Sequence, residues 1–220
     1  MNLLLVMTDG RRECIKRTIP AALAMVEGID HRVIYTDAGD ESYTHWLHTN
    51  FPTFDVLESQ KRLGFGGAIE RAWQIILDNY DFDYVFHLED DFIIEKPVDL
   101  KDFMAVLEER PYLQQMALLR QAWNEEEKKA GGIVQQNPDQ FVPNQCRGYS
   151  WVEHRRFFTT NPSLYRRELV KRGWPNVKNS EGNFTLELTK DPTVQFGMWG
   201  PKFTEPWVNH IGNERIGSGY

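Results

Sequence analysis

The sequence predicts one α/β domain with a mostly parallel central sheet. Its 220 residues, 41% of them hydrophobic, are a usual length and composition for one such domain. Residues 2–7, 31–35 and 84–88 are short apolar runs of the kind that form buried strands. Between the first two runs, residues 12–26 place apolar side chains at helical spacing. This strand, helix, strand order is the usual opening of a parallel sheet, whose ligands bind at the carboxyl ends of the strands.

The remaining elements are expected from the same periodicities and from turn residues. Pro20 lies inside the first predicted helix, so we expect a kink or a late start there. Further along, we expect a strand near 54–57, a helix opened by the glycines of 64–67, a helix at 102–109, a strand at 115–119, a charged turn or helix at 124–129, a loop at 131–143, a strand at 157–160, a helix at 164–172 and a helix starting near Ser180.

Composition excludes several classes of protein. No apolar run approaches the roughly 20 residues of a membrane-spanning helix, so no span is expected. The N-terminal run has no basic region before it and soon meets Asp9, Arg11 and Arg12, which favours a first strand over a signal peptide. The two cysteines form neither a disulfide framework nor a zinc pattern. A cytoplasmic protein is therefore expected.

The net charge of -7 is unevenly distributed along the chain. Residues 1–144 carry 14 Lys and Arg against 25 Asp and Glu, whereas residues 145–178 carry eight against two. A basic segment in an acidic protein is consistent with an anionic acceptor. It is equally consistent with a solvated helix whose arginines face water.

Polar residues follow each predicted strand. Thr8, Asp9 and Arg11 come after the first, Asp37 comes after the second, and residues 89–91 (Glu-Asp-Asp) come directly after the third. Three consecutive carboxylates repel one another and need either full solvation or a cation. Mg²⁺ and Mn²⁺ prefer carboxylate and water ligands and bridge to diphosphate oxygens. A metal site and a wet acidic loop are the two interpretations of this turn.

Residues 84–92 resemble the DxD-bearing strand of GT-A glycosyltransferases, particularly family 2-like enzymes, and residues 62–68 are similar to the glycine-containing segment that precedes it. The resemblance implies a GT-A, Rossmann-like domain in which residues 1–142 bind a nucleotide-sugar and residues 143–220 form the acceptor half and a C-terminal lid. It also implies a UDP- or GDP-sugar donor with Mn²⁺ or Mg²⁺. The donor-site residues it implies are Thr8, Asp9, Arg11, Asp37, Arg62, Gly66, Glu89 and Asp90, with Asp91 on the metal. Among them, Asp37 would contact the base and Thr8 and Arg11 the nucleoside. Either Glu89 or Asp90 would lie near the ribose and sugar. The acidic turn departs from a strict Asp-x-Asp because its first member is Glu89.

Two later features fit the same resemblance. Glu181 lies where inverting members of the fold place the carboxylate that takes the acceptor proton, although Gly182 follows it where an acidic residue often stands. Glu187 is a second candidate base, and helix capping is the structural alternative for Glu181. His210 resembles a C-terminal histidine that some GT-A enzymes add to the metal, and residues 213–220 are suited to a lid.

The function expected from the sequence is metal-dependent glycosyl transfer to an acceptor hydroxyl, with inversion inferred only from the candidate base. A nucleotidyltransferase acting on sugar phosphates and a non-catalytic nucleotide-sugar-binding module are the alternatives. The acceptor class stays open among a saccharide, a protein, a small molecule and a modified DNA base.

Overall fold

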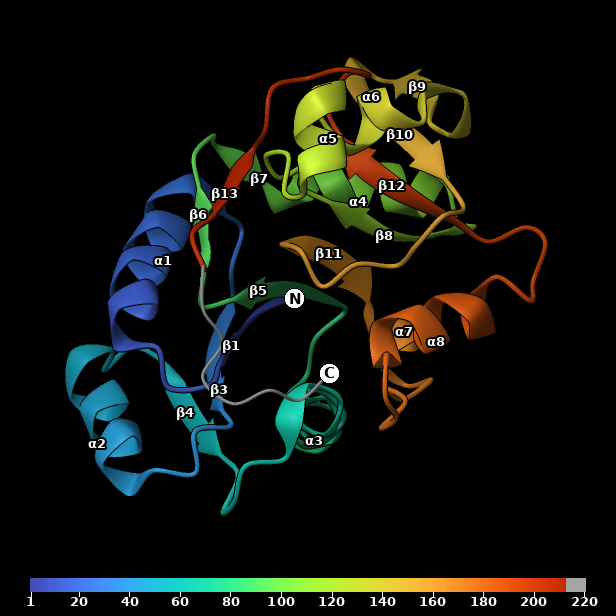
Figure 1. The fold of residues 1–220 in the computed structure, drawn as a ribbon. Helices are drawn as coiled ribbons and strands as arrows, with labels where there is room; N and C mark the ends of the chain where they lie inside the picture. Colours follow the sequence, from blue (N-terminus) through green and yellow to red (C-terminus); the bar gives the residue numbers. More distant parts are fainter. Residues whose placement is uncertain (213–220) are drawn as a thin grey trace.

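The computed structural model describes residues 1–212 of the chain. Its central layer is a nine-stranded sheet in the order β4-β3-β1-β5-β11-β8-β12-β10-β9 (Figure 1). The sheet strands are β1 (Asn2–Thr8), β3 (His31–Thr36), β4 (Asp55–Glu58), β5 (Tyr84–Glu89), β8 (Leu113–Ala117), β9 (Val142–Cys146), β10 (Tyr149–His154), β11 (Ser163–Arg166) and β12 (Gln195–Trp199). Two short pairs lie outside it, namely β2 (Val26–Glu27) with β7 (Val98–Asp99), and β6 (Phe92–Ile94) with β13 (Val208–His210).

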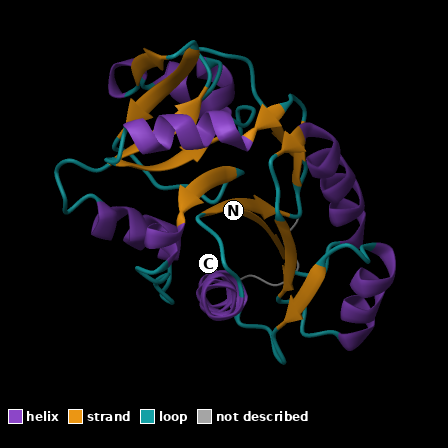
Figure 2. Cartoon of the chain, turned by 180° about the vertical axis from the view of Figure 1, so that it is seen from behind, coloured by secondary structure: helices purple, strands orange, loops and turns teal. Residues whose placement is uncertain are grey.

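Helices cover both faces of the sheet (Figure 2). They are α1 (Arg12–Met25), α2 (Glu41–Asn50), α3 (Gly64–Asn79), α4 (Leu100–Glu109), α5 (Glu125–Ala130), α6 (Ile133–Gln136), the 3₁₀ turn η1 (Pro138–Gln140), α7 (Arg167–Val170) and α8 (Ser180–Leu188). Side chains of β1 alternate between the two layers. Leu4 and Val6 pack with α1, α2 and α4, whereas Leu3 and Leu5 pack with α3, α7 and α8. Because both faces are covered, β1 is buried throughout, as its continuous apolar sequence predicted.

The sequence predicted the N-terminal half of this architecture well. The strands β1, β3 and β5 pair in parallel, with β1 in the middle. The helix α1 runs unbroken through Pro20, so it starts neither late nor at the proline. Strand order reverses at β1, which places a crevice beside the carboxyl ends of β1 and β5.

The expectation of a mostly parallel sheet is only partly correct, because the sheet is mixed. β11 runs antiparallel to both of its neighbours, β5 and β8, and β10 runs antiparallel to β12 and β9. The helix expected at 164–172 is instead strand β11 followed by the short helix α7. The strand expected at 157–160 is irregular chain. Within residues 1–212, no helix has the length and apolar character needed to cross a bilayer.

Candidate functional site

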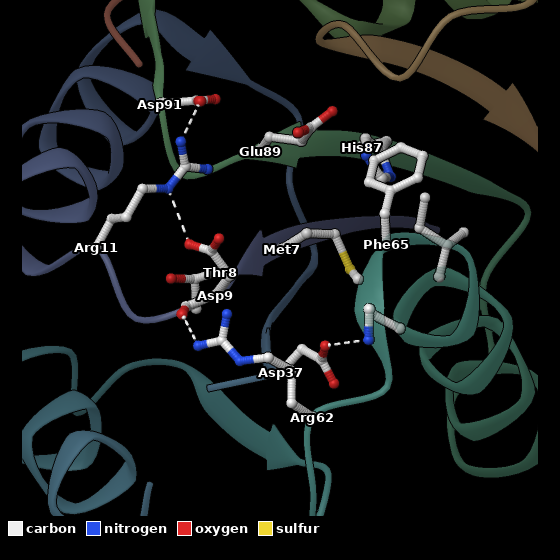
Figure 3. Close-up of a pocket in the computed structure, with 13 residues that line it drawn as sticks. Met7, Thr8, Asp9, Arg11, Asp37, Arg62, Phe65, His87, Glu89 and Asp91 are labelled. Atoms are coloured by element: carbon white, nitrogen blue, oxygen red, sulfur yellow. Dashed lines mark hydrogen bonds and ion pairs between the residues drawn. The ribbon is translucent and has the colours of Figure 1, made fainter. Parts of the chain in front are cut away.

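Three strand ends bring the predicted polar residues to one edge of the sheet. In the parallel register, Thr8 of β1 pairs with Thr36 of β3, and Met7 pairs with Glu89 of β5. Neighbouring strands lie about 4.8 Å apart, so side chains that follow these ends must face one another. Figure 3 shows Thr8, Asp9, Arg11, Asp37, Glu89 and Asp91 around one cavity at this edge, hereafter the first cavity.

Arg11 is the centre of charge in the first cavity. Gly10 has φ +112°, a conformation that glycine adopts without strain, and it turns the chain directly after β1. The Arg11 guanidinium then donates from Nε to Asp9 (2.9 Å) and from its two terminal nitrogens to Asp90 and Asp91 (2.5 Å each). Burial disfavours the charged guanidinium, but the three carboxylates outweigh it and raise the pKa of Arg11.

Asp90 holds the acidic turn in place through hydrogen bonds and does not line the first cavity. Its carboxylate accepts the Thr8 hydroxyl at 2.5 Å, and its carbonyl accepts the Thr18 hydroxyl at 2.7 Å. The Thr8 hydroxyl also lies 2.7 Å from the hydroxyl of Tyr43. Complete burial raises the pKa of Asp90 to about 7, against the opposing effects of Arg11 and Thr8. Asp90 thus contacts Thr8 and Arg11 and lies outside the lining of the first cavity, and the place near the ribose and sugar that the resemblance implies for it stays a prediction.

Asp91 and His210 are brought together by the β6–β13 pair, in which His210 lies opposite Phe92. The His210 Nε2 atom is 3.1 Å from Asp91 Oδ2. The imidazole stacks on Phe92 at a centroid distance of 4.6 Å and contacts Trp123 on a loop at 4.1 Å. Burial raises the pKa of Asp91, but the hydrogen bond from His210 and the charge of Arg11 outweigh it, so the pKa is lowered.

Asp91 and His210 fit a two-ligand cation site. Asp91 Oδ1 is buried and has no hydrogen-bond partner among the described residues. The described part of the chain contains no cluster of three or more His, Cys, Asp or Glu able to hold a metal on their own. A divalent cation here would therefore need oxygen ligands from phosphate and water, which is how Mg²⁺ commonly binds in phosphate-handling sites.

Asp37 caps the start of α3. Its carboxylate accepts the amides of Leu63 and Gly64 (both 2.8 Å at the closest) and the hydroxyl of Ser59 (2.8 Å). The backbone amides of Leu63 and Gly64, at the start of α3, are thus bound by Asp37. Arg62 donates to the Asp9 carbonyl at 2.9 Å. Asp37 and Arg62 both line the first cavity.

Gly66 has a packing role in this structure. It does not line the first cavity, and a Cβ at Gly66 would lie 3.3 Å from the Ser180 side chain and 3.4 Å from the Pro175 carbonyl. The glycine therefore lets α3 approach the start of α8 closely. The donor contact that the resemblance implies for Gly66 stays a prediction.

A second cavity of about 420 Å³ lies beyond Glu89, within the size range of small-molecule sites. Glu89 lines both cavities and stands where they meet. Burial, together with the charges of Asp91 and Glu181, raises its pKa to about 8. The walls of the second cavity include Trp123, Phe157 and neutral polar groups such as Asn161.

Glu181 lies in the second cavity, in the first turn of α8. Its Oε1 atom accepts the Thr160 amide at 2.8 Å and the Thr160 hydroxyl at 3.4 Å. Glu187, the other candidate base, is six residues further along the same helix. It pairs with Lys190 at 2.7 Å and lines neither the first nor the second cavity. The geometry thus favours Glu181.

The arginines of the basic segment bind the protein's own backbone. Arg155 donates to four carbonyls and so holds the turn that follows α8 in place. The carbonyls belong to Thr189, Asp191, Pro192 and Val194. Arg166 donates to the carbonyls of Leu107 and Leu113, and Arg167 donates to those of Leu77, Tyr80 and Phe82. These contacts give Arg155, Arg166 and Arg167 a structural role that needs no anionic acceptor. They also differ from the solvated helix expected, because the three side chains bind carbonyl groups instead of facing only water.

Several residues in or near the two cavities carried no signal in the sequence. Trp123 and Thr160 line the second cavity from irregular chain. Tyr43 of α2 lines neither cavity but contacts Thr8. Gln121 holds the backbone on both sides of His210, because its side chain donates to the His210 carbonyl and accepts the His210 amide (2.8 Å each). The lid expected at 213–220 lies outside the described residues.

The doubly covered sheet with an acidic turn at the end of β5 is the GT-A fold. Staphylococcus aureus TarS, residues 1–349 in complex with UDP-GlcNAc, is similar in structure at a TM-score of 0.63 and 16% identity, covering 99% of this chain and 60% of that one. The mannosyltransferase PcManGT from Pyrobaculum calidifontis, in complex with GDP-Man and Mn²⁺, is similar at a TM-score of 0.56 and 12% identity, covering 92% and 55%. The chain thus spans little more than half the length of these proteins. No family model and no curated protein sequence matches it.

Proposed function

We propose that this protein is a glycosyltransferase that moves a sugar from a nucleoside-diphosphate sugar to an acceptor hydroxyl. The observation that carries the proposal is the meeting of two cavities at Glu89, one at the strand ends of a GT-A fold and the other containing Glu181. The structures of TarS with UDP-GlcNAc and PcManGT with GDP-Man support a nucleotide-sugar as the donor.

The residues divide between donor and acceptor. The nucleoside diphosphate lies in the first cavity, beside Arg11, Asp37 and Arg62, and the transferred sugar lies near Glu89. The acceptor enters the second cavity, where its hydroxyl oxygen attacks the anomeric carbon as the bond from that carbon to the β-phosphate oxygen breaks. Glu181 takes the hydroxyl proton and the nucleoside diphosphate leaves. Because the acceptor attacks from the side opposite the leaving group in a single displacement, the anomeric carbon inverts.

Asp91 and His210 would hold Mn²⁺ or Mg²⁺ against the diphosphate. Such a cation, when bound, supplies charge compensation for the departing diphosphate. The Arg11 guanidinium at the same edge offers the phosphates additional hydrogen bonds. Burial of the acidic turn excludes water from these interactions and so strengthens them.

The experiment that tests the donor assignment measures binding of UDP, GDP, UDP-GlcNAc and GDP-mannose by thermal shift, with and without Mn²⁺. We expect Asp91→Asn to weaken Mn²⁺-dependent nucleotide binding at least about tenfold, because the amide loses the charge that attracts the cation. Asp139→Asn, an exposed position away from both cavities, is the control. Equal affinity of wild type and Asp91→Asn in Mn²⁺ would remove Asp91 from the metal site.

The two alternatives are separated from this proposal by their products. A nucleotidyltransferase would release pyrophosphate from a nucleoside triphosphate and a sugar 1-phosphate. A non-catalytic binding module would bind the donor and never form free nucleoside diphosphate, with or without an acceptor. Slow hydrolysis of UDP-GlcNAc or GDP-mannose to the nucleoside diphosphate would exclude both.

A further inference from the structure

Arg11 occupies an unusual position for a cationic side chain. Its side chain is 13% exposed, and its guanidinium forms ion pairs with Asp9, Asp90 and Asp91 at 2.9, 2.5 and 2.5 Å. Asp90 is fully buried and Asp91 is nearly so. A single positive charge thus compensates three carboxylates, two of which have little access to water.

The Arg11 guanidinium binds the same oxygen of Asp91 that would bind the cation. Asp91 Oδ2 accepts Arg11 Nη1 at 2.5 Å and lies 3.1 Å from His210 Nε2. A Cβ on Gly212 would come within 2.1 Å of the same oxygen, so the backbone of Gly212 also lies against it. Mg²⁺ binds carboxylate oxygens at about 2.1 Å. A cation held by Asp91 Oδ2 and His210 would therefore lie next to the Arg11 guanidinium, which is 2.5 Å from the same oxygen. The two positive charges would repel each other strongly at this distance.

Displacing Arg11 with a metal alone is unfavourable. The guanidinium would give up its ion pairs with the buried carboxylates Asp90 and Asp91, and the metal alone offers it no new acceptor in exchange. A nucleoside diphosphate changes this balance, since its phosphate oxygens accept a guanidinium in bidentate fashion. The phosphates also supply the oxygen ligands that Asp91 and His210 lack for a complete cation site.

We propose that Arg11 takes the place of the divalent cation in the unliganded protein, so that Mn²⁺ or Mg²⁺ binds only together with a nucleoside diphosphate, to which Arg11 transfers. The inference rests on the proposed function for the identity of the diphosphate. It makes metal and nucleotide binding mutually dependent, each raising the affinity of the other by the same factor.

The test measures Mn²⁺ binding to the full chain by electron paramagnetic resonance, without turnover. Wild type should show no saturable Mn²⁺ binding below about millimolar concentrations, and UDP or GDP should raise its Mn²⁺ affinity at least about tenfold. Arg11→Met removes the charge at similar length, and it should bind Mn²⁺ alone at least about tenfold more tightly than wild type. The factor by which UDP or GDP raises the Mn²⁺ affinity should be smaller for Arg11→Met than for wild type. Adding Asp91→Asn to Arg11→Met should abolish the gain.

Two controls make each outcome decisive. Arg12→Met removes the neighbouring guanidinium, which lies over the Tyr43 and Trp46 rings and does not line the first cavity, and it should leave Mn²⁺ binding without nucleotide unchanged. Circular dichroism checks the fold of every variant. If Arg11→Met does not fold, Arg11→Gln replaces it, because the neutral amide keeps a hydrogen-bond donor for the carboxylates without the positive charge. This variant should also bind Mn²⁺ more tightly than wild type.

Tight Mn²⁺ binding by wild type without nucleotide would overturn the inference, as would an Arg11 variant that folds and binds Mn²⁺ no better than wild type. Either result would leave the glycosyltransferase proposal standing if wild type still binds Mn²⁺ with UDP or GDP. An absence of Mn²⁺ binding under every condition would overturn this inference and the metal-dependent part of the proposed function together.

Discussion

At the scale of single residues, Glu181 combines the two properties that a general base requires. It lies on a cavity wide enough for an acceptor, and the Thr160 amide fixes one oxygen of its carboxylate at 2.8 Å. The carboxylate also lies in the first turn of α8, a position that suits a purely structural carboxylate as well. A kinetic measurement therefore separates the two roles.

We expect Glu181→Gln to lower kcat by roughly 100- to 10,000-fold, the usual contribution of general-base catalysis, with donor affinity nearly unchanged. The amide keeps the size and can keep the hydrogen bond from Thr160, but it cannot take the acceptor proton. Steady-state kinetics with saturating UDP-GlcNAc or GDP-mannose, together with thermal shift, measures both effects. Glu187→Gln on the outer part of the same helix is the matched control. A Glu181→Gln enzyme with wild-type kcat would end the assignment of Glu181 as base.

The residues predicted from the sequence are those that follow predicted strands. Thr8, Asp37 and Glu89 meet because parallel strands end at one edge, a rule that needs no knowledge of distant contacts. Trp123 and Gln121 reach the site through tertiary packing on β13, which no local pattern encodes. Gly66 shows the converse limit, since a glycine that permits helix packing is indistinguishable in sequence from one that permits a phosphate contact.

At the scale of elements, the C-terminal half shows how tertiary context overrides local periodicity. Residues 164–172 place apolar side chains at spacings that suit a helix, yet the first three belong to β11. That strand pairs with β5 on one side and β8 on the other, and Leu164 and Tyr165 are buried within the sheet. Burial on both faces removes the alternation from which a strand is recognised.

The loop between β8 and α5 presents Trp123 to the second cavity. The Trp123 side chain is 42% exposed although one of its contacts is His210 at 4.1 Å. An exposed indole at the wall of a cavity offers a flat apolar surface to the face of a sugar ring. The titratable residues that line this cavity in the described part of the chain are Glu89, Arg120, Glu181 and His210, and Arg120 is paired with Glu127 at 2.7 Å. An uncharged saccharide suits this lining better than an anionic acceptor.

We therefore expect Trp123→Ala to raise the acceptor KM by roughly 2- to 10-fold, which corresponds to about 0.5–1.5 kcal/mol of ring stacking. Neutral p-nitrophenyl glycosides and their phosphorylated counterparts, compared as acceptors, provide the measurement. Trp123→Phe should restore most of the loss, and Phe203→Ala, an exposed aromatic outside both cavities, should change nothing. Because Trp123 also contacts His210, Mn²⁺-dependent UDP binding is measured in parallel. A preference for the phosphorylated glycosides would contradict the expected acceptor class.

At the scale of the whole molecule, the sheet interleaves the two halves that the sequence suggested. The expected boundary between residues 142 and 143 falls inside β9. Strand β8 of the first half lies between β11 and β12 of the second, and β13 pairs with β6. The site depends on the same interleaving, because His210 and Glu181 belong to the second half and Asp91 belongs to the first. Sequence periodicity could place the elements along the chain, but the order of strands across the sheet is set by contacts far apart in sequence.

This interleaving predicts that the two halves do not fold separately. The full chain should unfold in urea in one cooperative transition, followed together by far-UV circular dichroism and tryptophan fluorescence. The fragment 1–142 lacks β11, so β5 and β8 each lose a hydrogen-bonded neighbour and the buried contacts of Leu164 and Tyr165 disappear. Its free energy of unfolding should fall below about 1 kcal/mol, against roughly 5–15 kcal/mol for an ordinary native domain, and no cooperative transition should be seen. A fragment 1–142 that unfolds cooperatively, with the helix and strand content of the intact protein's first half, would instead make residues 1–142 an independent nucleotide-binding domain.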